Sequence, residues 1–240
     1  MKKWMSLSSI LSLFLIWYVL YLWVDHPLLL PSISKTGMAL ISFFTQRDAL
    51  MALMTTFGRL GVILGISFGV SFMLAYISYK KNYIEAFIHP YMVLFKTVPL
   101  VSIILILFVL LDYQITPYII TFLMIMPVLY QAFYTGLKTI DKDYIDVFTL
   151  EDNKIITSFR YLYFPMIKTY LIMGVLQSIG LGIKVIVMAE FIIQSKVGLG
   201  RYIYQARVNL EYDKIYAITI VLVCLSFLLE KLIKKQQPIT

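Results

Sequence analysis

TIDKDYIDVFTLEDNKIITSFRYLYFP, residues 139–165, is the longest polar stretch in a chain of 240 residues that is otherwise mostly apolar. Strongly apolar runs flank it on both sides, so this charged stretch must lie in water. Its apolar residues recur at roughly helical spacing, and Asp152 or Asn153 could cap a second helix. We interpret the stretch as two short amphipathic helices, at about residues 141–164, that offer one face to a partner. A structured surface loop without a partner is an open alternative.

The composition indicates an integral membrane protein. Hydrophobic residues make up 60% of the chain and charged residues 14%. In soluble proteins, about a quarter of the residues are charged. The net charge of +8 comes from cations in small groups at the ends of apolar runs, which indicates membrane topology and not nucleic-acid binding. The single cysteine, Cys224, excludes an intramolecular disulfide and a cysteine metal cluster.

Six segments are long and apolar enough to cross a bilayer, which takes about 20 residues as a helix. They are residues 7–24, 50–78, 97–111 with help from the residues before them, 117–137, 165–193 and 215–233. We therefore predict an all-α membrane protein with about six transmembrane helices. Lysine and arginine are concentrated on the side of the termini and of residues 139–165, which predicts that both termini are cytoplasmic.

Residues 1–48 are predicted to form the first transmembrane helix and an outer interfacial segment, and residues 49–240 the transmembrane core. Pro27 and Pro31 break the chain after the first span, and Ser32 or Ser34 can cap a short interfacial helix. The first span is longer than a signal-peptide core and lacks a small-x-small cleavage site, so we expect it to be retained.

The second span carries a stripe of small residues and one arginine. Gly61, Gly65 and Gly69 recur every four residues, which predicts close packing of another helix. Arg59 is costly to leave in hydrocarbon. We expect its side chain to extend to the outer headgroups, with a partner or a wet cavity as the alternatives.

The fifth span is chemically unusual because it carries Gln177, Ser178, Lys184 and Glu190. At about 1.5 Å per residue, Gln177 lies near mid-membrane, Lys184 in the outer half and Glu190 near the outer boundary. Gln177 and Lys184 are seven residues apart and share a face. Ionisable residues at such depth indicate function, so we predict that these four residues line a translocation pathway. A structural role for Lys184, as a polar link between helices or in a pair with Glu190 or Arg59, is the alternative.

Catalytic and metal-binding patterns are not found in the sequence. His26 and His89 are predicted to lie on opposite sides of the membrane, which excludes a histidine metal site or a histidine-based triad between them. The chain has no GxxxxGK[ST] phosphate loop, so it is not an ATPase. It also has no GxSG-like nucleophile turn, which argues against an intramembrane hydrolase.

Five segments match, in order, those of a known family. They are LPSISKTGMAL (30–40), like LPSPSEVL; TTFGRLGVILGISFGV (55–70), like SLLRVLLGFLLGIPLG; FIHPYMVLFKTVPLVSIILILFVLL (87–111), like EPLLQLLRPIPPLALLPLLILWF; GLKTIDKDYIDVF (136–148), like GLRSVDPDLLEAA; and MAEFIIQSKVGLGRYI (188–203), like VAEMLGAASGLGYLI. Over nearly its whole length the chain thus resembles the membrane subunit of a binding-protein-dependent ABC importer, in particular the nitrate, sulfonate and taurine permease group.

The polar stretch resembles that family's coupling motif, which is EAA, three residues, Gly, and a proline thirteen residues further on. Counting back from Pro165 places the glutamate at Asp146, the alanines at Val147 and Phe148, and the glycine at Asp152. Both alanines are replaced by bulkier residues and the glycine is lost, although Asp tolerates the left-handed turn conformation. The resemblance implies ATPase contacts by the following residues: Asp146, Val147, Phe148, Thr149, Leu150, Glu151, Asp152 and Arg160.

The resemblance implies a MetI-like permease architecture in the bacterial cytoplasmic membrane. It implies a second permease copy, in a homodimer, two ABC ATPase subunits that bind ATP and Mg²⁺, and an extracytoplasmic solute-binding protein. No cofactor is expected on this chain. A sulfonate, taurine or nitrate-like anion is the favoured solute, and a pyrimidine precursor of thiamine or another ring solute is the alternative. An ion-driven secondary transporter would predict inverted repeats, and residues 1–120 and 121–240 show no such similarity.

Overall fold

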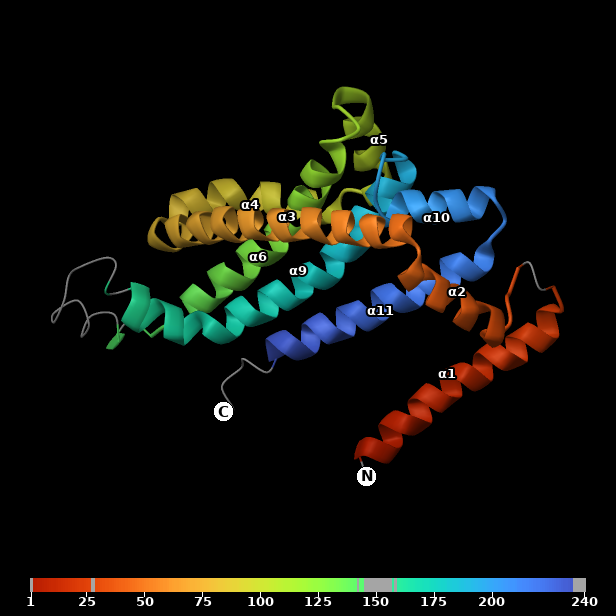
Figure 1. The fold of residues 1–240 in the computed structure, drawn as a ribbon. Helices are drawn as coiled ribbons and strands as arrows, with labels where there is room; N and C mark the ends of the chain where they lie inside the picture. Colours follow the sequence, from red (N-terminus) through yellow and green to blue (C-terminus); the bar gives the residue numbers. More distant parts are fainter. Residues whose placement is uncertain (1, 27–28, 142, 145–156, 158, 235–240) are drawn as a thin grey trace.

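The computed structural model describes residues 2–26, 29–141, 143–144, 157 and 159–234 of the chain. Every regular element in these ranges is a helix, which confirms the all-α prediction (Figure 1). The elements are α1 Lys2–Val24, α2 Ile33–Thr45, α3 Arg47–Lys80, α4 Asn82–Thr97, α5 Leu100–Leu110, α6 Thr116–Lys138, the π-turn η1 Phe159–Tyr163, α9 Phe164–Ile192, α10 Leu199–Val208 and α11 Tyr212–Lys234.

Four described helices are long and apolar enough to cross a membrane: α3, α6, α9 together with η1 from Arg160, and α11. The helix α3 has 34 residues, so at 1.5 Å per residue it is roughly 50 Å long and exceeds a hydrocarbon core of about 30 Å. The helix α1, Lys2–Val24, covers the first predicted span, residues 7–24, and within it Leu11–Val24 is a described apolar segment.

The third predicted span, residues 97–111, is not one straight helix. The helices α4 and α5 meet there at an angle of 101°, and only the bent pair together is long enough to count as a fifth span. Pro99 explains the break, because a proline disfavours helical backbone in the residue before it, and Val98 has an extended ψ of 130°. The described residues therefore contain four spans, or five with the bent pair, where the sequence predicts about six.

The helices α3, α6 and α9 form the packed centre of the molecule, with α11 and α10 beside α9 (Figure 1). Small residues allow α6 and α9 to approach closely. A Cβ added at Gly174 would lie 2.6 Å from the Cβ of Ala132, and one at Gly136 would lie 2.9 Å from the Cβ of Tyr170. The Ser71 hydroxyl of α3 donates a hydrogen bond of 2.9 Å to the Met126 carbonyl of α6, which ties these two helices together.

The glycine stripe of α3 faces away from this centre. A Cβ added at Gly61, Gly65 or Gly69 would meet nothing within 4 Å, so within the described chain no helix packs on this stripe. The buried face of α3 instead consists largely of other small residues. The buried residues of α3 are Ala49, Ala52, Thr56, Leu60, Ile63, Ser67, Ser71, Ala75 and Ser78, and all but Leu60 and Ile63 are small. Serine and alanine allow close approach nearly as well as glycine, and serine also supplies a hydroxyl for cross-helix bonding.

The helices α1 and α2 lie at the periphery. On α1, the Trp17 ring packs 5.5 Å from the Tyr216 ring of α11, and its indole N–H donates to the Pro31 carbonyl at 3.3 Å. The helix α2 begins after Ser32, whose hydroxyl accepts from the Lys35 amide at 3.3 Å. One of the two predicted capping serines therefore starts the predicted short helix.

Candidate functional site

One face of α9 is exposed along much of its length. Gln177 and Lys184 both lie on this face, together with Met173 and Met188, as expected for positions separated by multiples of a helical turn. Two of the four predicted pathway residues are therefore on one open surface. We call the stripe formed by Met173, Gln177, Lys184 and Met188 the α9 stripe.

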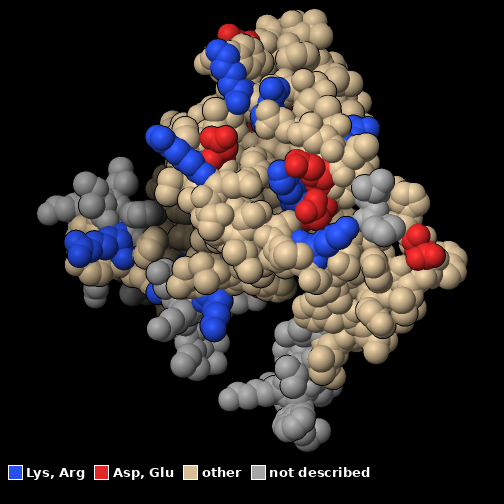
Figure 2. Space-filling model, turned by 45° about the vertical axis from the view of Figure 1, so that its right-hand side comes forward, with Lys and Arg blue, Asp and Glu red and all other residues tan. Residues whose placement is uncertain are grey.

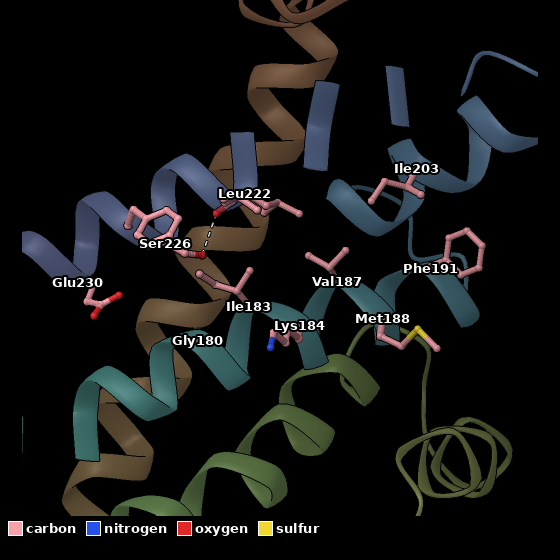
Figure 3. Close-up of a pocket in the computed structure, with 12 residues that line it drawn as sticks. Gly180, Ile183, Lys184, Val187, Met188, Phe191, Ile203, Leu222, Ser226 and Glu230 are labelled. Atoms are coloured by element: carbon pink, nitrogen blue, oxygen red, sulfur yellow. Dashed lines mark hydrogen bonds between the residues drawn. The ribbon is translucent and has the colours of Figure 1, made fainter. Parts of the chain in front are cut away.

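A groove of about 720 Å³ runs between α9 and α11, with Ile203 of α10 at one side (Figure 3). Its walls are mainly aliphatic and aromatic, and Lys184 and Glu230 are the two charged residues that line it. The Ser226 hydroxyl donates to the Leu222 carbonyl of its own helix at 2.8 Å, shown as a dashed line in Figure 3. This hydroxyl is therefore already satisfied as a donor within the groove.

Lys184 is exposed and belongs to neither of the ion pairs found in the described ranges, Arg59–Glu190 and Lys214–Glu211. The predicted alternative, a structural pair with Glu190 or Arg59, is thus wrong within this chain. An unpaired lysine at membrane depth costs about 2.5–3.5 kcal/mol on insertion scales. Its ammonium group therefore needs water, an anion or a partner chain. Gln177 lines a separate cavity of about 260 Å³ that also includes Glu230.

Ser178 is not on the α9 stripe. It is fully buried, and in the part of the chain that the structure describes its hydroxyl has no hydrogen-bond partner. Successive helical residues are about 100° apart, so Ser178 points into the helix packing when Gln177 points outward. The prediction that Ser178 shares an open surface with Gln177 and Lys184 is therefore wrong within this chain, because Ser178 lies on a different face of α9.

Glu190 is the centre of a buried polar cluster. Its Oε1 lies 2.7 Å from Arg59 Nη1, and its Oε2 accepts a 2.8 Å hydrogen bond from the Thr56 hydroxyl. The backbone amide of Gly200 donates to the same Oε2 at 3.1 Å. Glu190 has no exposed surface, and the Arg59 side chain is 13% exposed. A buried carboxylate of this kind is tolerated when it is paired and hydrogen-bonded.

The same cluster fixes the loop between α9 and α10. The Leu199 amide donates to the Thr56 hydroxyl at 2.8 Å, and Arg59 Nη1 donates to the Val197 carbonyl at 2.9 Å. Gly198 has a φ of 150°, and a Cβ there would collide with the Glu190 carboxylate. The loop sequence VGLG is thus shaped around the carboxylate, with glycine required at position 198.

This arrangement corrects two predictions. Arg59 does not extend to the outer headgroups but pairs with Glu190, and Glu190 lies inside the packing and not on the α9 stripe. The six-residue step from Lys184 to Glu190 turns the helix by about 240°, which places the two side chains on different faces. The residues missed by sequence reasoning are Thr56, Gly198 and Gly200. The sequence signal that could have indicated this contact is Glu190 followed eight residues later by GLG, residues 198–200.

The predicted ATPase contacts are only partly described. Residues 146–152 lie outside the described residues. Arg160 is exposed in η1, and its guanidinium carbon lies 5.6 Å from the centre of the Tyr161 ring. Its exposure leaves it accessible to another chain.

The family model for the inner membrane component of binding-protein-dependent transport systems matches residues 61–238. The chain belongs to this family. It is a permease component of an ABC importer and a multi-pass protein of the cytoplasmic membrane, with the MetI-like helical architecture. The family implies membership of an ABC transporter complex with ATPase and binding-protein partners, and such permeases are generally not enzymes. A search of curated proteins found no match.

Proposed function

We propose that this chain pairs with a second copy to form the membrane channel of an ATP-driven importer for a small anion. An extracytoplasmic binding protein delivers the solute, and two ATPase subunits, which bind ATP and Mg²⁺, drive the transport cycle. The observation that carries the solute class is Lys184, a cation on the α9 stripe at the wall of a mainly apolar groove, which has no ion-pair partner among the residues that the structure describes.

The charge of Lys184 favours a negatively charged solute. Among the described residues that line the groove, Lys184 is the one cation and Glu230 the one anion. A cation beside low-dielectric walls attracts an anion next to it more strongly than the same charge in bulk water. The walls beside it include Val187, Met188 and Phe191, which suit a small apolar body. An alkylsulfonate combines an anionic head with such a body and is favoured over bare nitrate; taurine, which carries an ammonium group at its other end, is the sulfonate used as the probe. Phe191 and Phe227 also line the groove, so a ring solute such as a pyrimidine is the second candidate.

The two ends of the molecule would receive different partners. Figure 2 shows the face that includes the α2 and α10 end, where acidic and basic side chains are interspersed on a largely uncharged surface. We assign this face to the outside and to the binding protein. The opposite end carries the turn η1 with Arg160, and we assign it to the ATPase. Movement of the ATPase dimer can shift the permease only through a difference in affinity for its inward and outward states.

Uptake of labelled taurine into vesicles that hold the assembled importer tests this proposal. Lys184→Ala is expected to reduce uptake at least tenfold, which corresponds to about 1.4 kcal/mol, and Lys184→Arg to restore much of it. Lys231→Ala is the matched control, because Lys231 is an exposed lysine of α11 that does not line the groove. Competition by excess nitrate or a pyrimidine separates the solute classes. Unchanged uptake in Lys184→Ala, or failure to co-purify an ATPase, would contradict the proposal.

A further inference from the structure

Lys80, the last residue of α3, lies among three tyrosine rings. Its ammonium nitrogen is 5.8 Å from the centre of the Tyr76 ring, 5.7 Å from that of Tyr79 and 5.5 Å from that of Tyr163. The ammonium also donates a 3.1 Å hydrogen bond to the Tyr163 hydroxyl. A cation within about 6 Å of a ring centre is attracted by the ring's charge distribution, so all three rings hold Lys80. We call these four residues the Lys80 cage.

The cage joins two separate parts of the chain. Tyr76, Tyr79 and Lys80 belong to α3, whereas Tyr163 is the last residue of η1. The Tyr163 ring is 5% exposed and meets the other two rings edge-on, at 6.0 Å and 88° from Tyr76 and at 6.4 Å and 76° from Tyr79. The end of α3 is thereby fastened to the turn from which α9 starts.

The turn η1 is poorly secured by its own backbone. It is a π-turn, a wide form of helix that occurs in short pieces and often at functional sites. Pro165 follows it and has no amide to donate to the Tyr161 carbonyl, so one α-helical bond is missing here. Leu162 and Tyr163 are buried while Arg160 and Tyr161 are exposed. Side-chain contacts such as the Lys80 cage therefore set where η1 sits.

In the chain, η1 forms the end of the predicted ATPase-coupling segment, about residues 141–164, and leads directly into α9. We propose that Lys80 and Tyr163 are positioning residues for transport, which pass a displacement of the coupling segment into α3 as well as into α9. The far half of α3 carries Thr56 and Arg59, which bind Glu190 and the VGLG loop. A push at one end of α3 therefore reaches the groups that fix the loop at the other. This inference rests on the proposed function.

Distances between spin labels on the complete importer, in lipid nanodiscs, test the inference without knowledge of the solute. The background is Cys224→Ser. One label pair replaces Met73 of α3 and Leu228 of α11, and the second replaces Thr169 of α9 and Leu228, all of them exposed and outside the groove. Both distances are measured without nucleotide and after trapping with ADP and vanadate. We expect both pairs to shift in the otherwise unchanged protein.

In Lys80→Met, the shift of the α3 pair is expected to vanish while that of the α9 pair persists. Tyr163→Phe removes only the hydroxyl and keeps the ring, so the α3 shift should fall by about half. If Lys80→Met does not assemble, this milder variant tests the role of the Lys80 cage. Lys80→Arg should keep the shift. Tyr161→Phe and Lys138→Met are matched controls, because Tyr161 is an exposed ring of the same turn and Lys138 a lysine that ends α6 over the ring of Tyr134.

Failure of the role proposed for the Lys80 cage can be distinguished from failure of the proposed importer function. A wild-type α3 shift in both Lys80→Met and Tyr163→Phe overturns the role of the cage and leaves the importer assignment intact. Absence of any nucleotide-dependent shift in the unchanged complex overturns the proposed function and, with it, this inference. Equal loss of both shifts in Lys80→Met and in its control Lys138→Met would show a general defect of assembly and would also refute a specific role for Lys80.

Discussion

Replacing Glu190 with glutamine should release the loop between α9 and α10. The carboxylate accepts from Arg59, Thr56 and the Gly200 amide, whereas a glutamine side chain has only one acceptor oxygen. The NH₂ group of the glutamine would then face one of the groups that donate to the carboxylate, and two donors cannot form a hydrogen bond with each other. The Arg59 guanidinium, which is 13% exposed, would also lose its counter-charge. Breaking a buried ion pair in this way costs about 3–5 kcal/mol.

Trypsin cleavage after Lys196 measures that cost. Lys196 is exposed in the loop that the cluster fixes, and cleavage requires the loop to open locally. When opening is fast relative to cleavage, the rate follows the open population. A loss of 3–5 kcal/mol, at 1.4 kcal/mol for each factor of ten, raises the rate roughly 100- to 4000-fold.

The surface pair Lys214–Glu211 provides the control. Its nitrogen and oxygen are 2.8 Å apart, nearly as close as in the buried pair, but its side chains are 27% and 38% exposed. Exposed pairs contribute about 0–1 kcal/mol, so Glu211→Gln should change cleavage after Lys196 by less than about fivefold. Replacing both buried partners, as Arg59→Met with Glu190→Leu, should recover much of the protection. Equal cleavage rates in Glu190→Gln and Glu211→Gln would refute the role given to the cluster.

Three further results are expected. Gly198→Ala should increase trypsin cleavage after Lys196 as Glu190→Gln does, because its Cβ would collide with the carboxylate; a rate like that of the unchanged protein would contradict this. Gly174→Ala should lower the thermal unfolding midpoint in detergent through overpacking of about 1–3 kcal/mol, whereas Gly65→Ala meets nothing within 4 Å and should not; equal midpoints would count against the packing described. Asp146→Lys combined with Glu151→Lys should abolish uptake and uncouple ATP hydrolysis while the protein stays in the membrane, and normal uptake would remove the coupling assignment.

The long apolar helices were predictable because their signal is local. An apolar run of sufficient length becomes a helix in lipid, whatever its neighbours, since backbone groups must be satisfied within the segment. The runs at 50–78, 117–137, 165–193 and 215–233 are accordingly found as α3, α6, α9 and α11. The 101° bend between α4 and α5 was not predictable in size. Pro99 marks the break, but the surrounding helices decide the angle.

The positions of the site residues were predictable only where they depend on the spacing of residues along a single helix. Gln177 and Lys184 share a face through their spacing, and the structure exposes both. Arg59 and Glu190 are separated by 131 positions, and no local pattern shows that they meet. The spacing of Gly61, Gly65 and Gly69 resembles that of Ser67, Ser71 and Ala75 on another face of α3, so spacing alone does not show which stripe packs against α6.

A photo-reactive amino acid at position 151, in the stretch between α6 and α9, shows whether this stretch contacts an ATPase subunit. The chain is purified from membranes with its partners, irradiated with and without ATP, and the cross-linked product is identified by mass spectrometry. We expect a cross-link to an ATP-hydrolysing subunit, with a yield that depends on nucleotide. An importer complex in which position 151 forms no cross-link to such a subunit under either condition would contradict the coupling assignment.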